Sequence, residues 1–382
     1  MKTVGIICEY NPFHLGHARQ LHMIREKFGE DTRIVGVMSG NYVQRGAPAM
    51  WDKYTRAAMA VSCGVDVVLE LPITHVLQSA EGFAQGGVEI LRRFGGVEFL
   101  CFGAECGDGD ALMHVAEEME NAEFSNLLRS GLDQGLSYAA ARQAALSDQG
   151  KFVRHPNDIL GVEYCRAILK QEADIKPFVI QRTGSYHELE PNPKAPSATA
   201  VRALYPDRNW KHYVPDACHE LLDHASWYRL DFGERAVLGR LRGLQDAEWE
   251  QCAHGGEGLW SKAMKAARSQ PNLEAVIRAT KSKRYPMTRI QRLLLCAYLG
   301  ITQEDLQTTI SYGRILDFSA RGRVLLREAR ERGALPLVNP GQRPPDRIYY
   351  ALEQRASDLF TLFAAPDHPM LCGMEQNSRV KK

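Results

Sequence analysis

Two histidines near the start of the chain carry the most informative chemistry. His14 and His17 flank Gly16, where an apolar run ends and a helical pattern begins. A spacing of three residues places both imidazoles on one side of the first helical turn, beside backbone N–H groups that lack partners within the helix. The positive end of the helix dipole lies there too, so this turn suits a phosphate. It would stabilise charge that develops on an α-phosphate as pyrophosphate leaves. Two surface histidines at a helix start are the alternative.

A second group with phosphate chemistry lies near the middle of the chain. Ser197 and Thr199 begin a predicted helix, and Arg202 follows Thr199 by about one turn. Hydroxyls at a helix start together with a nearby cation suit a departing pyrophosphate. A helix cap followed by an exposed arginine explains the same residues without a ligand.

A polar loop bounded by glycines follows the second predicted strand. It contains Ser39, Asn41, Gln44 and Arg45. These side chains could hold a small carboxylate or a nucleobase, and Arg45 is the one that we expect to meet a carboxylate or phosphate. An ordinary polar surface loop is an equally good interpretation.

Alternating strands and helices must position these residues. Apolar runs predict strands at 3–8, 34–38, 65–71 and 97–102, with another at 175–181, and helices near 17–27, 51–63 and 79–94. This alternation is typical of an α/β fold, a Rossmann-like (HUP-type) parallel sheet with right-handed crossovers. Neither a G-x-G-x-x-G fingerprint nor a Walker A loop is present, so the dinucleotide and P-loop classes are excluded.

Helical patterns dominate the second half of the chain. From about residue 206 they predict an all-helical domain with helices at 221–242, 249–267, 272–280, 286–299, 319–332 and 347–361. We therefore predict a catalytic domain at 1–205, a helical domain at 206–374 and a flexible tail at 375–382.

The charge is uneven along the chain. The formal net charge is +1, yet residues 261–350 hold 17 Lys and Arg against 7 Asp and Glu. A polyanion such as RNA would dock on the densest basic cluster, Lys281, Lys283, Arg284, Arg289 and Arg292. A solvated helical surface is the alternative.

The composition is that of an ordinary globular protein, with 45% hydrophobic and 24% charged residues. We expect no membrane span and no secretion leader, because no apolar stretch approaches eighteen residues. Nine scattered cysteines without a C-x-x-C pair fit a reducing cytoplasm and do not form a metal-ligand set.

Longer blocks of sequence resemble a known family. His14-x-Gly16-His17 resembles the HxGH signature of the nucleotidyltransferase superfamily. The wider match is similar to the bacterial tRNA(Met) cytidine acetate ligase family over residues 1 to about 320. It rests on EYNPFHLGH (9–17), SGNYVQRGAPA (39–49), GVDVVLELP (64–72), CFGAE (101–105), HPNDILGVEY (155–164), PSATAVR (196–202) and KRYPMTRIQRLLL (283–295).

The resemblance implies a reaction and a set of binding residues. In that family ATP and acetate form acetyl-adenylate and pyrophosphate, and the acetyl group passes to the wobble cytidine of elongator tRNA(Met), giving N4-acetylcytidine. His14 and His17 would act on the phosphates. The implied ATP contacts are Ile7, Cys8, Glu9, Tyr10, Asn11, Pro12, Phe13, His14, Gly16, His17, Gln20, Gly103, Asn157, Arg182, Ser197, Thr199 and Arg202.

Some of these residues have simpler interpretations. Without the resemblance, Asn157 would be interpreted as a helix N-cap and Arg182 as a solvated residue at a strand end. Ser197–Arg202 is similar to the second phosphate-binding signature of nucleotidyltransferases, but the lysine that this signature has in the aminoacyl-tRNA synthetases is missing here. Mg²⁺ is expected with ATP from phosphate chemistry, and neither a membrane nor a protein partner is implied. Two other functions stay open: a small-molecule nucleotidyltransferase, and a non-catalytic RNA-binding protein with a nucleotide pocket.

Overall fold

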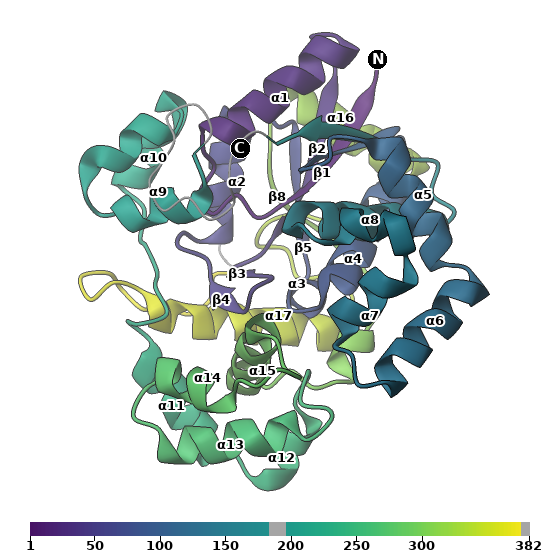
Figure 1. The fold of residues 1–382 in the computed structure, drawn as a ribbon. Helices are drawn as coiled ribbons and strands as arrows, with labels where there is room; N and C mark the ends of the chain where they lie inside the picture. The colour runs from purple at the N-terminus through teal and green to yellow at the C-terminus, as the bar shows by residue number, and fades with distance from the viewer. Residues whose placement is uncertain (183–195, 376–382) are drawn as a thin grey trace.

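A central sheet organises the molecule (Figure 1). The computed structural model describes residues 1–182 and 196–375. Within these residues the sheet has seven strands in the order β7-β6-β1-β2-β5-β8-β9. Their bounds are β1 (Thr3–Cys8), β2 (Arg33–Ser39), β5 (Val67–Leu71), β6 (Phe99–Ala104), β7 (Lys176–Gln181), β8 (Gly313–Phe318) and β9 (Leu337–Val338). A small hairpin, β3 (Tyr42–Val43) and β4 (Ala47–Pro48), follows β2.

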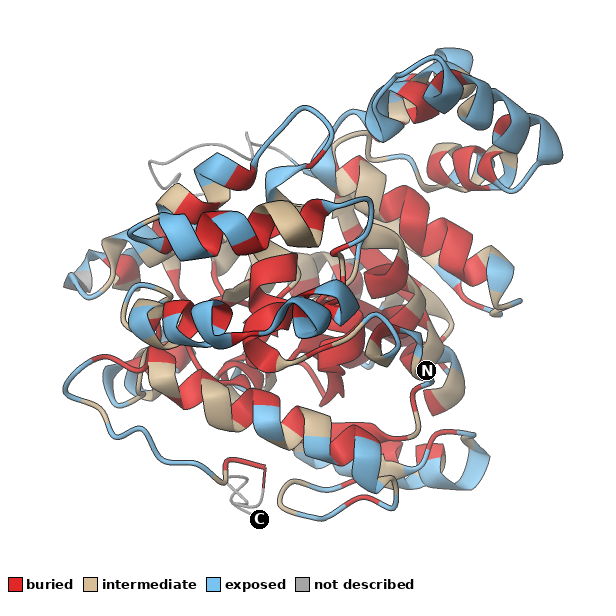
Figure 2. Cartoon of the chain, turned by 90° about the horizontal axis from the view of Figure 1, so that it is seen from below, coloured by how far each residue is buried: buried red, intermediate tan, exposed pale blue. Residues whose placement is uncertain are grey.

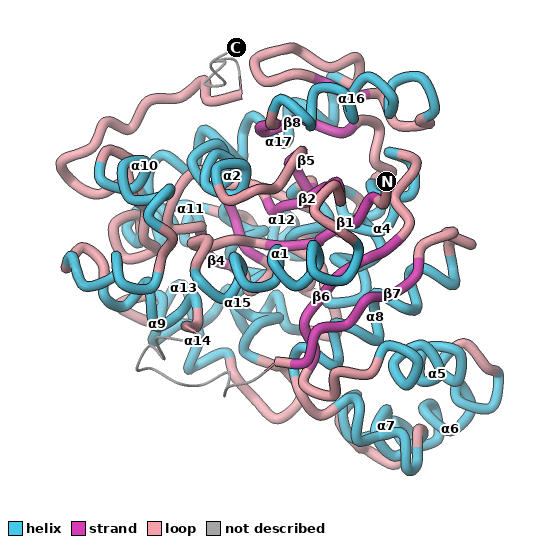
Figure 3. Tube along the Cα trace, turned by 90° about the horizontal axis from the view of Figure 1, so that it is seen from above, coloured by secondary structure: helices cyan, strands magenta, loops and turns pink. Residues whose placement is uncertain are grey.

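The first five strands of the sheet are parallel, which confirms the predicted α/β fold. β1 lies between β2 and β6, and Thr3 is paired in register with Arg33. Strands β1, β2 and β5 are almost entirely buried, as expected for parallel strands covered on both faces. Figure 3 shows these strands running side by side across the molecule, with helices around them.

Helices cover both faces of the sheet. α4 (Ala80–Phe94) and α8 (Pro156–Lys170) pack against each other and against the strands on one face. The right-handed crossovers from β1 to β2 and from β2 to β5 place α1 (Leu15–Phe28) and α2 (Lys53–Ser62) on the other face. The apolar side chains between these layers form the main core. In Figure 2 the buried residues are coloured red.

The remaining helices form outlying groups around the sheet (Figure 1). Among the described residues, no helix is long and apolar enough to cross a membrane. The bounds of these outlying helices are α3 (Ile73–Val76), α5 (Gly109–Met119), α6 (Ala122–Asp133), α7 (Tyr138–Ala145), α9 (Ala198–Leu204), α10 (His219–Asp223), α11 (Glu234–Gly243), α12 (Asp246–Gln251), α13 (Leu259–Ser269), α14 (Leu273–Thr280), α15 (Met287–Leu299), α16 (Ala320–Arg332) and α17 (Arg347–Phe360).

The C-terminal part is helical, as predicted, but it also contributes two strands that the sequence pattern missed. β8 pairs antiparallel with β5, and β9 pairs with β8. The expectation of helices alone through 206–374 is corrected by these strands, because the segment after residue 312 returns to the central sheet. The boundary at residue 205 stays a prediction. Glu375, the first residue of the predicted tail, is buried, and 376–382 lie outside the described residues.

Five ionisable side chains are buried where this returning segment meets the sheet. We call them the buried ion cluster: Lys53, Glu70, Arg314, Glu353 and Glu375. Lys53 Nζ lies 2.7 Å from Glu70 Oε2 and also pairs with Glu375. Arg314 Nε lies 3.3 Å from Glu375 Oε2 and 3.8 Å from Glu353 Oε2. The cluster therefore joins α2, β5, β8, α17 and the C-terminal segment.

Candidate active site

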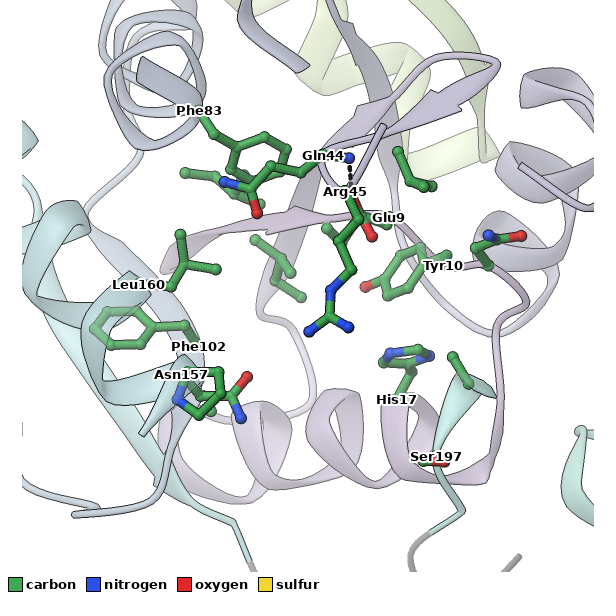
Figure 4. Close-up of a pocket in the computed structure, with 18 of the residues that line it drawn as sticks. Glu9, Tyr10, His17, Gln44, Arg45, Phe83, Phe102, Asn157, Leu160 and Ser197 are labelled. Carbon is green, nitrogen blue, oxygen red and sulfur yellow. Dashed lines mark hydrogen bonds between the residues drawn. The ribbon is translucent and has the colours of Figure 1, made fainter. Parts of the chain in front are cut away.

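A cavity of about 350 Å³ opens at the carboxyl ends of β1 and β6 (Figure 4). β1 and β6 are parallel neighbours, but the strand that follows β1 (β2) is added on one side of this pair and the strand that follows β6 (β7) on the other. The cavity therefore lies at the topological switch point, where α/β sheets bind ligands. Most of the residues that the sequence singled out line it: Ile7, Cys8, Glu9, Tyr10, Asn11, His14, His17, Gln20, Gln44, Arg45, Gly103, Asn157, Arg182, Ser197, Thr199 and Arg202.

The two histidines stack against each other at the start of α1. Their ring centroids are 3.7 Å apart, and His14 is the N-cap of the helix. The Gly16 N–H donates to His14 Nδ1 at 3.1 Å, and the His14 N–H donates to His17 Nδ1 at 3.2 Å. Because each Nδ1 accepts a hydrogen bond, the proton of each neutral ring is on Nε2. Each ring thus offers one N–H donor to a ligand.

Burial keeps both rings neutral. It lowers the pKa of His14 to about 3, with the cationic Arg182 and Arg202 adding to the effect. The pKa of His17 is also well below its usual value because of burial, His14 and Arg182. Two arginines close enough to act on His14 make the cavity electropositive, which favours a polyphosphate.

Ser197, Thr199 and Arg202, the second set of residues predicted to bind phosphate, line the cavity opposite the histidines. Ser197 caps α9 by accepting from the Ala200 N–H at 3.1 Å. Arg202 donates to Asn11 O at 2.6 Å and to Thr199 Oγ1 at 3.1 Å. These bonds attach α9 to the β1 loop and bring hydroxyls, a guanidinium and the imidazoles to one end of the cavity, which we call the phosphate end.

The opposite end is less polar. Phe83, Phe102 and Leu160 line it, and Figure 4 shows them with Asn157 on the side away from His17 and Ser197. Gly103 is the last residue but one of β6, and a Cβ atom at this glycine would lie 3.1 Å from Arg182 Cγ. A flat apolar group with a few polar atoms, such as a nucleoside, fits this surface. We call it the nucleoside end.

The polar loop after β2 divides between the cavity and the core. Gln44 and Arg45 line the cavity, and the Gln44 N–H donates to Glu9 Oε1 at 2.7 Å (Figure 4). Ser39 and Asn41 do not line it. Ser39 is fully buried, and Asn41 donates to Ser357 Oγ at 3.2 Å and accepts from the Lys53 N–H at 2.9 Å.

Three residues of the β1 loop lie beside the cavity without lining it. Pro12 and Phe13 are buried under the histidines, and the Phe13 ring lies 5.4 Å from that of His17. A Cβ atom on Gly16 would lie 2.9 Å from His14 Cε1. Gly16 therefore leaves space for the His14 ring.

Sequence reasoning missed two side chains that support the site. Arg56 is fully buried on α2 and donates to Glu9 O and Gly40 O, as well as to Ser39 O at 3.1 Å, which holds the loops after β1 and β2 together. Glu105 accepts from Asn157 Nδ2 at 2.6 Å. Glu105 lies in the CFGAE block, two residues after Gly103, and this position could have identified it from the sequence. No sequence signal marks Arg56, because it lies within a predicted helix.

The predicted basic cluster divides into exposed and internal residues. Lys281, Lys283 and Arg284 are exposed. Arg289 donates to His254 O and Gly256 O, both at 3.2 Å, and Arg292 donates to Gln44 O at 3.4 Å. The last two guanidinium groups thus make contacts within the protein. As for metals, the described residues contain no group of three or more His, Cys, Asp or Glu placed to hold an ion.

Known proteins match this chain over almost its full length. A family model described as HIGH Nucleotidyl Transferase matches residues 1–371. A protein of Alkaliphilus metalliredigens named tRNA(Met) cytidine acetate ligase is 35% identical, and the alignment covers 95% of this chain and 94% of the relative.

Two solved structures are similar as well. The apo crystal structure of Thermotoga maritima TmcAL has a TM-score of 0.91 and 30% identity, covering 100% of this chain and 99% of that chain. The structure of TmcAL bound with alpha-thio ATP has a TM-score of 0.86 and 31% identity, covering 98% and 97%. The chain therefore belongs to the HIGH nucleotidyl transferase family, among the members named tRNA(Met) cytidine acetate ligases.

Proposed function

We propose that this chain is an ATP-dependent ligase that activates acetate as acetyl-adenylate and transfers the acetyl group to the wobble cytidine of elongator tRNA(Met), giving N4-acetylcytidine. The observation that carries this proposal is the pair of neutral imidazoles, each with an Nε2–H donor, facing Ser197, Thr199 and Arg202 across one end of the cavity. The names of the relatives supply the acid and the acceptor.

The geometry suits adenylation. With the triphosphate at the phosphate end, a carboxylate oxygen attacks the α-phosphorus and the bond to the β-phosphate oxygen breaks, releasing pyrophosphate. His14 and His17 donate hydrogen bonds to phosphate oxygens as charge shifts toward the leaving group. No covalent bond to the protein is needed, so holding the two substrates in line supplies much of the rate enhancement.

Arg45 is the residue that we propose for the acetate. Its guanidinium extends into the middle of the cavity, on the side of Tyr10 and His17 that faces Asn157 (Figure 4). A guanidinium binds a carboxylate through two parallel hydrogen bonds, which would hold acetate near the α-phosphate. Mg²⁺ binds triphosphates through their oxygens and water, so we propose that ATP enters as its magnesium complex.

We propose that the tRNA docks on the exposed basic residues Lys281, Lys283 and Arg284. Of these, Arg284 also lies near a carboxylate at the surface, with its Nε 3.5 Å from Glu257 Oε2. The location that we propose is cytoplasmic. All nine cysteines are free thiols, as is usual in a reducing compartment.

ATP–pyrophosphate exchange tests the proposal. Exchange that requires acetate is expected, and mass spectrometry of tRNA after the complete reaction should show one added acetyl group on a cytidine. A small-molecule nucleotidyltransferase would exchange pyrophosphate only with a different cosubstrate. A chain that binds ATP and tRNA but never exchanges pyrophosphate would be the non-catalytic RNA-binding protein.

A further inference from the structure

The orientation of one amide at the nucleoside end is set by a carboxylate behind it. Asn157 is the second residue of α8, and its Nδ2 donates to Glu105 Oε1 at 2.6 Å. A carboxylate that carries no proton can only accept hydrogen bonds. Glu105 therefore draws the NH₂ group of Asn157 toward itself and leaves the amide oxygen for the cavity. Figure 4 shows this oxygen directed toward the middle of the cavity and the nitrogen turned away.

A second hydrogen bond fixes the carboxylate. Glu105 Oε2 accepts from the Asp158 backbone N–H at 3.0 Å. This N–H is in the first turn of α8, where no helical carbonyl is available, so it needs an acceptor from outside the helix. Both oxygens of Glu105 thus have a donor. The Asp158 carboxylate holds the same strand end by accepting from the Cys106 N–H at 2.9 Å.

This arrangement matters for recognition because an amide side chain has both a hydrogen-bond acceptor and a hydrogen-bond donor. An Asn side chain that is free to rotate offers an oxygen or an NH₂ group and does not distinguish a donor from an acceptor on a ligand. Held by Glu105, Asn157 turns its NH₂ group away from the cavity and presents its oxygen there. Of the common purines, adenine has an amino group at C6, and hypoxanthine and guanine have a carbonyl oxygen there.

Resting on the proposed function, we propose that Glu105 is a positioning residue that sets nucleotide specificity: it orients Asn157 so that the amide oxygen accepts a hydrogen bond from the 6-amino group of adenine and repels a 6-keto purine. A ribose hydroxyl would not need a fixed amide, because it both donates and accepts. An acceptor that cannot turn distinguishes an amine from a ketone.

The substitution Glu105→Gln tests this orientation. The Asp158 N–H cannot turn, so the new glutamine must direct its oxygen to it and its NH₂ group to Asn157. Asn157 then turns over and presents its own NH₂ group to the cavity. Titration calorimetry with ATP and ITP, which differ at C6, reads the change. Wild type should bind ATP about 10- to 100-fold more tightly than ITP, because the wrong base leaves a buried polar group unpaired. In E105Q we expect this ratio to fall to one or below.

A double substitution gives the rescue. Asn157→Asp alone places two carboxylates side by side and should weaken ATP binding. Combined with E105Q, the aspartate accepts from the glutamine NH₂ group with one oxygen and offers the other to adenine, so preference for ATP should return. A purely structural role for Glu105 would not produce this recovery. Glu117→Gln, on the exposed face of α5, is the matched control and should keep the wild-type ratio.

The outcomes separate this inference from the proposed function. An unchanged ATP to ITP ratio in folded E105Q, or equal binding of both nucleotides by wild type, overturns the inference alone. Wild type that binds neither nucleotide overturns the proposed function. If E105Q fails to fold by circular dichroism, Asn157→Ala provides the test, since removal of the amide should abolish the discrimination. An N157A variant that still prefers ATP as strongly as wild type contradicts the inference.

Discussion

The chemistry of the site depends on two imidazoles that share one tautomer. Each Nδ1 is occupied by a backbone N–H, and burial keeps each ring uncharged. A neutral ring with its proton on Nε2 donates a hydrogen bond to a phosphate oxygen without first gaining a second proton. The aromatic rings of Tyr10 and Phe13 lie against His17 and hold its orientation. The site therefore meets its ligand with donors already in place.

We predict that His17→Ala lowers the rate of acetate-dependent pyrophosphate exchange by about 10²- to 10³-fold, as the loss of one preorganised donor does elsewhere. The thermal midpoint should change little, since the ring is at the cavity wall. His22→Ala is the matched control, because His22 lies on the same helix with its side chain 67% exposed. Equal exchange rates in H17A and wild type would remove His17 from the mechanism.

At the level of secondary structure elements, the hairpin β3–β4 connects the cavity to the C-terminal helices. Gly46, in its turn, has φ +79° and lies directly on the backbone of α15. A Cβ atom there would be 2.6 Å from Arg292 N and 2.7 Å from Gln291 C. Arg292 also donates to Gln44 O. The position of Gln44 and Arg45 thus depends on a helix almost 250 residues later in the chain.

Gly46→Ala should destabilise the protein and weaken acetate binding, because either α15 or the hairpin must move. The control is Gly135→Ala, which has φ +85° and open space around it. Both variants incur the left-handed backbone cost of about 1–2 kcal/mol. Overpacking should add about 1–3 kcal/mol in G46A alone. Urea unfolding measures the loss of stability, and the KM for acetate in pyrophosphate exchange measures the loss of acetate binding. Equal losses of unfolding free energy in G46A and G135A would contradict the contact between Gly46 and α15.

The parts of the fold that were predictable are those with local signals. The strands that become β1, β2, β5 and β6 are continuous apolar runs, and the histidine turn follows the first of them directly. β8 was missed because Gly313–Phe318 is short, is neither a continuous apolar run nor a regular alternation of polar and apolar residues, and pairs with a strand far away in sequence. Ser39 and Asn41 have the composition of a binding loop, yet the returning segment buries them.

Site residues were predictable where their backbone position determines their role. Gly103 lies in the carboxyl end of β6 and Ser197 is the N-cap of α9, so the topology alone brings them to the cavity. Glu105 and Arg56 act through contacts between elements, and residue spacing does not reveal such contacts. Arg289 and Arg292 share a helix face by spacing, as expected, but that face meets protein carbonyls.

At the scale of the whole molecule, positive charge is concentrated in residues 261–350, which hold 17 Lys and Arg against 7 Asp and Glu. We predict that replacing Lys281, Lys283 and Arg284 by alanine weakens tRNA binding and lowers the salt slope, d log K/d log[salt], by about 2–3. The control replaces Arg323, Arg327 and Arg330 on α16, which are also exposed and carry the same charge. Filter binding at several salt concentrations measures both. Equal slopes for the first variant and wild type would place the tRNA elsewhere.

The buried ion cluster should impose a pH dependence on stability. Burial and the neighbouring Glu70 raise the pKa of Glu353 to about 8. The folded protein then holds a proton that the unfolded chain releases near pH 4.3. This group therefore contributes stability that is complete below about pH 4.3 and is lost progressively as the pH rises to about 8.

Glu353→Gln should flatten the decline of unfolding free energy between pH 5 and 8, measured by urea unfolding at each pH. Glu98→Gln is the control: its carboxyl pairs with Lys2 at the surface, and its pKa is lowered, so it titrates below this range. A wild-type slope in E353Q would show that Glu353 is ionised in the folded protein.

The return of the chain to its own central sheet has a consequence for synthesis on the ribosome. The β1, β2 and β5 strands emerge early, but the partner of β5 is Gly313–Phe318, and Glu375 is needed to neutralise Lys53 and Arg314. Until then the nascent chain has an open strand edge at β5 and an incomplete set of charges beside it. Such an edge is a template for pairing with other chains. The nascent protein is thus exposed to misassembly at this edge until Gly313–Phe318 is made, and a chaperone that covers β5 would act over most of its synthesis.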